Sequence, residues 1–127
     1  MYEDLGKLLL RLTLGILMLF HGVYKLRYGV SGIEGMLQNH GLSGLLAYGV
    51  FVGELLAPFL LLVGLYTRVA AIFIAFNMVV AVALAHTADL TEFTRSGGWA
   101  LELQGFFFFT AVVVFLIGPG KFSIDRR

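Results

Sequence analysis

Four long apolar stretches restrict the folds open to this chain more than any other feature of its sequence. They occupy residues 8–26, 45–66, 69–88 and 99–118. A helix needs roughly 20 mostly apolar residues to cross a bilayer core about 30 Å thick. Strands of a membrane barrel would instead alternate apolar and polar residues over about ten positions. We therefore predict an all-α polytopic membrane protein with four membrane-spanning helices.

The composition excludes the main soluble alternatives. Of the 127 residues, 59% are hydrophobic and 13% are charged, whereas globular proteins average roughly 25% charged residues. A domain of this size cannot hide such an excess of apolar side chains from water. The net charge of +1 argues against nucleic acid as a partner, and the absence of cysteine excludes disulfides and thiolate metal sites. We expect a single domain over residues 1–127 whose surroundings are the lipid bilayer.

The segments between the apolar stretches predict how the helices are connected. Residues 29–44 are rich in glycine, with a short helix expected at 33–39, and the tight turn at 67–68 makes the second and third helices antiparallel neighbours. Residues 89–98 are polar and loop-like. Proline and glycine at 118–121 end the fourth helix. The predicted architecture is an antiparallel four-helix bundle.

Lysine and arginine predict the orientation of this bundle. Short cytoplasmic loops carry an excess of these residues. One side of the predicted bundle carries Lys7, Arg11, Arg68, Lys121, Arg126 and Arg127, and the other carries Lys25, Arg27 and Arg95. We therefore expect both termini to face the cytoplasm, in a cytoplasmic (inner) membrane. The first stretch is expected to stay in the protein, because Glu3 and Asp4 stand where a signal peptide would be positively charged.

Glu54 is the most significant polar residue within the predicted spans. It lies 9 residues from the start and 12 from the end of its stretch, near the expected midplane, where ionisable groups are costly and usually functional. Gly49, Gly53 and Ala57 form a small-residue stripe that permits close helix packing. Pro58 leaves the carbonyl of Glu54 without its helical donor. We expect an inward-facing carboxyl that is neutral unless a cation pairs with it; the alternative is an acid that only bonds a neighbouring helix.

Further polar residues lie in the outer half of the predicted bundle. His21 and Lys25, four residues apart, share one helix face. Asn77 lies at mid-depth on the third helix, His86 near its outer end, and Glu102 near the outer end of the fourth. Together with the buried carboxyl they predict a polar pocket that opens outward, or laterally near the outer leaflet.

Plainer interpretations of these residues stay open. Lys25, like Arg11, can act as an interfacial anchor whose charge reaches the headgroups. Asn77 and Gln104 suit interhelical hydrogen bonds, and His86 suits the membrane interface. We expect no metal site, because the histidines and glutamates lack the Glu-x-x-His pairs of carboxylate-bridged bundles.

The ordered series of motifs resembles the DoxX family of small four-helix membrane proteins. The residues that carry the resemblance are Arg11, Gly15, His21-Gly22 and Lys25, then Gly53-Glu54 and Leu62-Val-Gly-Leu-Tyr-Thr-Arg68 with Val69-Ala-Ala, then His86, Glu102 and the closing Gly118-Pro-Gly-Lys-Phe-Ser-Ile-Asp125. The resemblance implies a link to respiratory chemistry, since related subunits belong to thiosulfate:quinone oxidoreductase and to a terminal quinol oxidase.

We therefore expect a redox-linked membrane subunit that binds a quinone-like or other small lipophilic molecule. Glu54 would carry a proton or form a hydrogen bond with the ligand, and Lys25 would stabilise negative charge at the pocket entrance. His21 and His86 would bind or protonate a ligand carbonyl, with Glu102 at the entrance. The expected site residues are catalytic Glu54 and His21, and ligand-binding His86, Glu102, Lys25 and Asn77.

Two other classes of function are compatible with this sequence. In one, the chain is a non-catalytic assembly subunit that joins a redox enzyme or forms a homo- or hetero-oligomer through its small-residue stripes. In the other it is one protomer of a small transporter, which would need to oligomerise because the chain is short for internal inverted repeats.

Overall fold

The computed structural model describes residues 1–85 and 91–125. Over these residues the chain is helical, and its one bridge of strand type joins Phe93 to Trp99. The elements in chain order are α1 (Tyr2–Tyr28), α2 (Ser31–Asn39), the 3₁₀-helix η1 (Gly44–Gly49), the π-helix η2 (Val52–Leu56), α3 (Ala57–Val63), α4 (Thr67–Ala85) and α5 (Glu102–Ile117). The predicted all-α class is therefore confirmed.

Three of the helical segments are long and apolar enough to cross a membrane. They are Tyr2–Tyr28, Gly44–Val63 and Thr67–Leu84. The fourth apolar helix, α5, is shorter, with 16 residues. It begins three residues later than predicted, because Trp99 is held in the bridge to Phe93. The chain is thus an integral membrane protein with several apolar helices.

The second of these segments is not one regular helix. It passes from 3₁₀ to π to α geometry between Gly44 and Val63. Pro58 provides no N–H for the carbonyl of Glu54, and the N–H of Ala57 instead reaches the carbonyl of Val52, five residues back. Single π turns inside helices occur frequently at functional sites. The helix expected over 45–66 therefore takes π geometry around Glu54, as the missing Pro58 donor led us to expect a local change there, and it ends at Val63.

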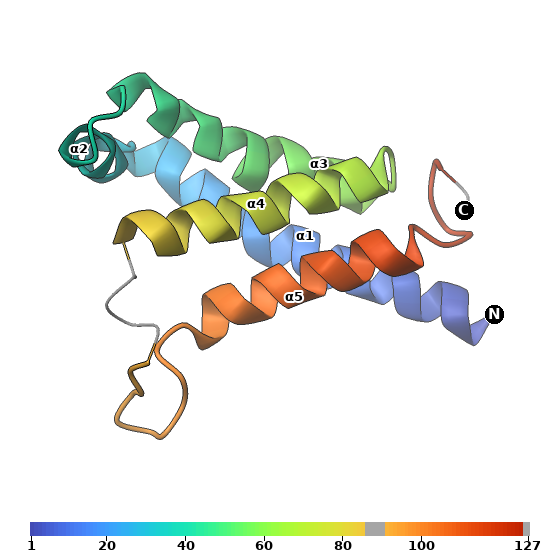
Figure 1. Ribbon diagram of the computed structural model, residues 1–127. Helices are drawn as coiled ribbons and strands as arrows, with labels where there is room; N and C mark the ends of the chain where they lie inside the picture. The colour runs from blue at the N-terminus through green and yellow to red at the C-terminus, as the bar shows by residue number, and fades with distance from the viewer. Residues whose placement is uncertain (86–90, 126–127) are drawn as a thin grey trace.

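The long helices run alongside one another, with both chain ends at one end of the molecule and α2 at the other (Figure 1). Helices α3 and α4 are joined by a tight turn in which Gly64 has a left-handed conformation (φ +72°). A side chain at Gly64 would overlap Ser123. The main core lies between the helices and includes Leu14, Met18, Leu61, Ile74, Ala111 and Val114. This apolar core holds α1, α3, α4 and α5 together.

Arg11 joins α1 to α3 and to the C-terminal segment, at the end of the molecule that carries the termini. Its side chain is 1% exposed. The guanidinium donates to the carbonyl oxygens of Leu61 (2.7 Å), Pro119 (3.0 Å) and Phe122 (2.5 Å). The interfacial anchor considered for Arg11 is therefore wrong: three inward-facing carbonyl acceptors satisfy the guanidinium inside the protein.

The C-terminal segment also caps α4. The Asp125 carboxylate accepts the backbone N–H groups of Tyr66 (3.1 Å) and Thr67 (3.0 Å). The Asp125 N–H donates to the carbonyl of Gly64 (2.9 Å). The first N–H groups of a helix have no partner within the helix, so this carboxylate satisfies donors at the start of α4.

Candidate intramembrane polar site

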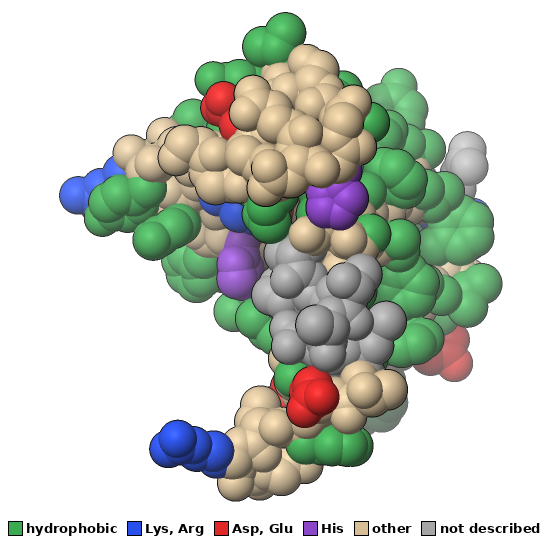
Figure 2. Space-filling view, turned by 60° about the vertical axis from the view of Figure 1, so that its left-hand side comes forward, with side chains coloured by type: hydrophobic (Ala, Val, Ile, Leu, Met, Phe, Trp, Pro, Cys, Tyr) green, Lys and Arg blue, Asp and Glu red, His purple; other side chains and the backbone are tan. Residues whose placement is uncertain are grey.

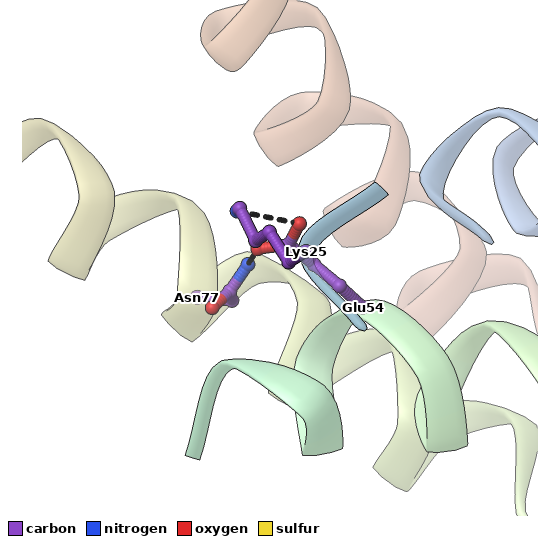
Figure 3. A network of polar contacts seen from close by, with 3 residues as sticks. All are labelled: Lys25, Glu54 and Asn77. Atoms are coloured by element: carbon purple, nitrogen blue, oxygen red, sulfur yellow. Dashed lines mark hydrogen bonds and ion pairs between the residues drawn. The ribbon is translucent and has the colours of Figure 1, made fainter. Parts of the chain in front are cut away.

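A buried carboxylate is held by a lysine and an amide from two other helices (Figure 3). The Lys25 Nζ lies 2.7 Å from Oε1 and 2.6 Å from Oε2 of Glu54. The Asn77 Nδ2 donates to Oε2 of Glu54 at 2.8 Å. We call Lys25, Glu54 and Asn77 the polar triad. Each member comes from a different one of the three segments that can span a membrane.

Burial explains why these three residues must meet. The side chain of Glu54 is 2% exposed and that of Lys25 is 28% exposed. A buried charge is tolerated only when it is paired and hydrogen-bonded. Lys25 supplies the opposite charge, and both carboxylate oxygens have partners. The geometry therefore supplies the cation that a charged carboxyl requires in these surroundings.

Glycines bring the three backbones close enough for this pairing. A methyl group on Gly22 of α1 would overlap the backbone carbonyl of Glu54. A Cβ atom on Gly53 would lie 2.7 Å from Cβ of Asn77. Small residues at helix contacts permit this close approach in membranes. The predicted close-packing role of Gly53 is seen here directly, beside the polar triad.

The polar triad lies toward the α2 end of α1. Gly15, the middle residue of α1, lies against the carbonyl of Pro58, and Gly22 lies against that of Glu54. Glu54 is therefore about 10 Å beyond the middle of α1, at 1.5 Å per residue. Helix η1, which precedes η2, contacts α2 and not α1, α4 or α5. The expected place of Glu54 near the membrane midplane stays a prediction.

An apolar cavity of about 750 Å³ opens beside the polar triad. It lies between α4 on one side and α2, η1 and η2 on the other. Its described lining is apolar or glycine except for Lys25, Glu54 and Asn77. Its volume falls within the range of about 300–1,000 Å³ that is usual for small-molecule sites. The apolar residues lining it are Ile33, Met36, Leu37, Leu42, Leu46, Ala47, Val50, Val52, Phe73, Phe76, Val80, Ala81 and Leu84.

This cavity lies at the end of the molecule that carries α2. Figure 2 shows that end, where charged side chains are few and lie apart from one another. An apolar cavity with a few convergent polar groups is the usual form of a small-molecule site. The arrangement can hold the polar part of a ligand at the triad and its apolar part along the remaining wall.

Two other predicted site residues, His21 and Glu102, are described but do not line this cavity. His21 is exposed and its ring packs edge-to-face on Phe107 of α5, with centroids 5.6 Å apart. Glu102 is exposed at the start of α5. His86 lies outside the described residues. The structure thus brings together Lys25, Glu54 and Asn77, whereas His21 packs on Phe107 and Glu102 lies at the start of α5.

The sequence predicted Lys25, Glu54 and Asn77 as members of one pocket, together with His21, His86 and Glu102. It left open an interfacial anchor for Lys25 and an interhelical hydrogen bond for Asn77, and it did not single out these three as a group. A useful signal was the spacing of Gly22 and Lys25, which puts the lysine one turn beyond a close helix contact. No group of three or more histidines or acids that could hold a metal occurs among the residues described.

The fold and the polar triad define a class, that of integral membrane proteins with a buried polar site between their helices. Residues 6–87 match the DoxX family, and the chain belongs to that family. The matched region contains all three members of the triad and ends before α5. The resemblance inferred from the motifs is confirmed.

Two relatives extend the comparison. The "Uncharacterized membrane protein Rv3486" of Mycobacterium tuberculosis is 30% identical, over 93% of this chain and 78% of its own length. The "Putative oxidoreductase CatD" of Bacillus subtilis is 34% identical, over 62% of this chain and 58% of its own length. No solved structure matches the chain significantly.

Proposed function

We propose that this DoxX-family protein is a redox-linked membrane subunit that binds a quinone-like or other small lipophilic molecule in the cavity beside the polar triad. The observation that carries the proposal is a charged pair and an amide at one end of an otherwise apolar cavity of about 750 Å³. The oxidoreductase name of one relative supports the redox link. A partner redox enzyme would exchange electrons with the bound molecule.

The polar triad offers hydrogen bonds to such a ligand. A lysine ammonium has three N–H donors, and the two oxygens of Glu54 engage Lys25 through short contacts. A remaining donor of Lys25 can meet a ligand carbonyl. Glu54 would accept or pass on a proton as the ligand changes oxidation state. His21, His86 and Glu102 stay predicted site residues, without a described contact to this cavity.

We also propose that α5 completes a fourth crossing, with both termini in the cytoplasm and the cavity in the outer half of a cytoplasmic membrane. Both termini lie at one end of the molecule (Figure 1), and an even number of crossings is needed for that. With 16 residues, α5 extends about 24 Å. A helix shorter than the local hydrocarbon thickness is accommodated by thinning of the bilayer.

Ligand binding tests the proposal. The purified protein in lipid nanodiscs is titrated with a decyl-substituted benzoquinone while the fluorescence of Trp99 and the absorbance of the ring are followed. We expect Asn77→Leu and Glu54→Gln to weaken binding by about five- to tenfold, since one hydrogen bond contributes about 1 kcal/mol. Gln104→Leu is the matched control, because Gln104 is a half-buried amide on α5 that does not line the cavity.

Equal affinity in the wild type and in both triad variants would contradict this function. Failure of the wild-type protein to bind any ring would favour the assembly subunit instead. Crosslinking in native membranes then tests for a neighbouring protein.

A further inference from the structure

We infer that the cavity takes a tailed amphiphile that enters sideways from the bilayer, with a neutral polar head at the triad and a hydrocarbon chain leaving between η1 and α4. This inference rests on the proposed function. It adds to it the class of ligand and the route by which the ligand arrives.

The residues that line the cavity differ widely in exposure. In the polar triad, Glu54 is 2% exposed and the Lys25 side chain is 28% exposed. Leu46 of η1 is 59% exposed and Phe76 of α4 is 63% exposed, and both line the same cavity. The exposed apolar wall of the cavity therefore lies between η1 and α4, and we call it the mouth.

The mouth opens toward lipid. Phe73 and Phe76 line the cavity, are exposed, and belong to Thr67–Leu84, which is long and apolar enough to span the membrane. Phe76 adjoins Asn77 of the triad in the chain. Exposed apolar side chains within a membrane span meet acyl chains. A ligand that leaves this mouth must continue into hydrocarbon, so its outer part is apolar.

The charge of the triad restricts the head of the ligand. The charges of Lys25 and Glu54 cancel in their ion pair. A charged head would bring an unpaired charge into an apolar wall, at a large desolvation cost. Beyond their contacts within the triad, Lys25 offers an N–H donor, and Asn77 offers its second amide N–H and its Oδ1 acceptor. These groups suit a neutral carbonyl or hydroxyl.

Two probes that share one head group distinguish the contribution of the tail to binding from that of the head. They are the decyl-substituted benzoquinone and the same ring without the chain. Each is titrated in nanodiscs with its concentration expressed per lipid, so that simple partition into the bilayer does not count as binding. We expect the wild type to bind the tailed ring about tenfold more tightly, because the cavity wall buries several methylene groups and part of this gain is already made in lipid.

Phe76→Ala and Phe109→Ala form a matched pair for the mouth. Phe76 is 63% exposed and lines the cavity, whereas Phe109 is 64% exposed on α5 and does not. We expect Phe76→Ala to weaken binding of the tailed ring about fivefold and to leave the tailless ring unchanged. Phe109→Ala should change neither. If Phe76→Ala leaves the affinity for the tailed ring unchanged while Asn77→Leu still weakens it, the inference is overturned. The proposed function would still stand in that case.

A crosslinking measurement on the wild type covers the case in which a variant does not fold. A photoreactive diazirine at the end of the decyl chain should label peptides that contain Leu46 or Phe76. Labelling confined to α5 would overturn the inference. The inference would also be overturned if native mass spectrometry showed a bound phospholipid that the tailed ring does not displace. If neither ring binds the wild type, the proposed function fails as well.

Discussion

Gly22 of α1 lies directly against the backbone carbonyl of Glu54, with no room between them for a methyl group. This contact sets the distance between α1 and the π turn that carries the carboxylate. One turn further along α1, Lys25 reaches both oxygens of the same residue. The ion pair thus depends on a glycine that takes no part in it.

Gly22→Ala should separate these two backbones. Overpacking of this kind costs about 1–3 kcal/mol, so we expect a lower midpoint of thermal unfolding in detergent. Gly6→Ala is the control in the same helix, because a Cβ there meets nothing within 4 Å. Gly6→Ala should leave stability unchanged or raise it by up to about 1 kcal/mol. Equal midpoints for the two variants would show that α1 and η2 do not pack this closely.

Lys25→Met should destabilise the protein by removing the partner of a buried carboxylate. Breaking a buried ion pair from one side costs about 3–5 kcal/mol. The free energy of unfolding, measured by denaturant titration in detergent, reports this loss.

The double variant Lys25→Met/Glu54→Gln distinguishes pairing from packing. A neutral glutamine leaves no buried charge and can still bond Asn77, so we expect it to restore at least half of the lost stability. Additive losses in the double variant would mean that the two side chains do not interact.

Arg11→Lys should loosen the C-terminal segment. A lysine ammonium cannot reproduce the planar fork that serves the carbonyls of Leu61, Pro119 and Phe122. We expect a loss of about 2–4 kcal/mol, since bonds from a charged donor contribute about 1.5–3 kcal/mol each. Hydrogen exchange of the peptide that covers residues 118–125 should accelerate.

Arg68→Lys provides the comparison for this prediction. Arg68 is exposed and donates to one carbonyl, that of Phe115. An exposed substitution of this kind changes stability by about 0.5 kcal/mol or less. Unchanged exchange in Arg11→Lys, or the same acceleration in both variants, would contradict the role given to Arg11.

Asp125→Ala should weaken the start of α4. Loss of a capping acceptor costs about 0.5–2 kcal/mol, and a negative charge near a helix N-terminus adds a favourable interaction with the helix dipole. We expect Asp125→Asn to lose less than Asp125→Ala, because the amide oxygen can still accept one of the N–H groups of Tyr66 and Thr67. Circular dichroism melts rank the three proteins. If the two variants melt together, the hydrogen bonds to the cap contribute nothing measurable.

Much of the fold was predictable because apolar length and chain breakers act locally. The short helix expected at 33–39 is found as α2, Ser31–Asn39. Gly118 ends α5 after Ile117, as its neighbouring proline and glycine indicated. The inward orientation of Glu54 followed from the cost of exposing a carboxyl to lipid.

The remaining features depend on contacts between distant segments. The pairing of Glu54 with Lys25 and Asn77 arises from how three helices approach at Gly22 and Gly53, which no local pattern encodes. Arg11 lies inside the protein because carbonyls more than a hundred residues away turn toward it. Helix periodicity alone contains neither relationship.

The origin of the polar triad in three separate segments has a consequence for biosynthesis. A nascent chain that has delivered only α1 and the segment Gly44–Val63 to the membrane contains both members of the charged pair, but the amide partner from α4 has not arrived. The carboxylate therefore gains its complete set of bonds only on insertion of α4. Chains halted before that point would carry an incompletely bonded acid, a feature by which membrane quality control can distinguish them from finished copies.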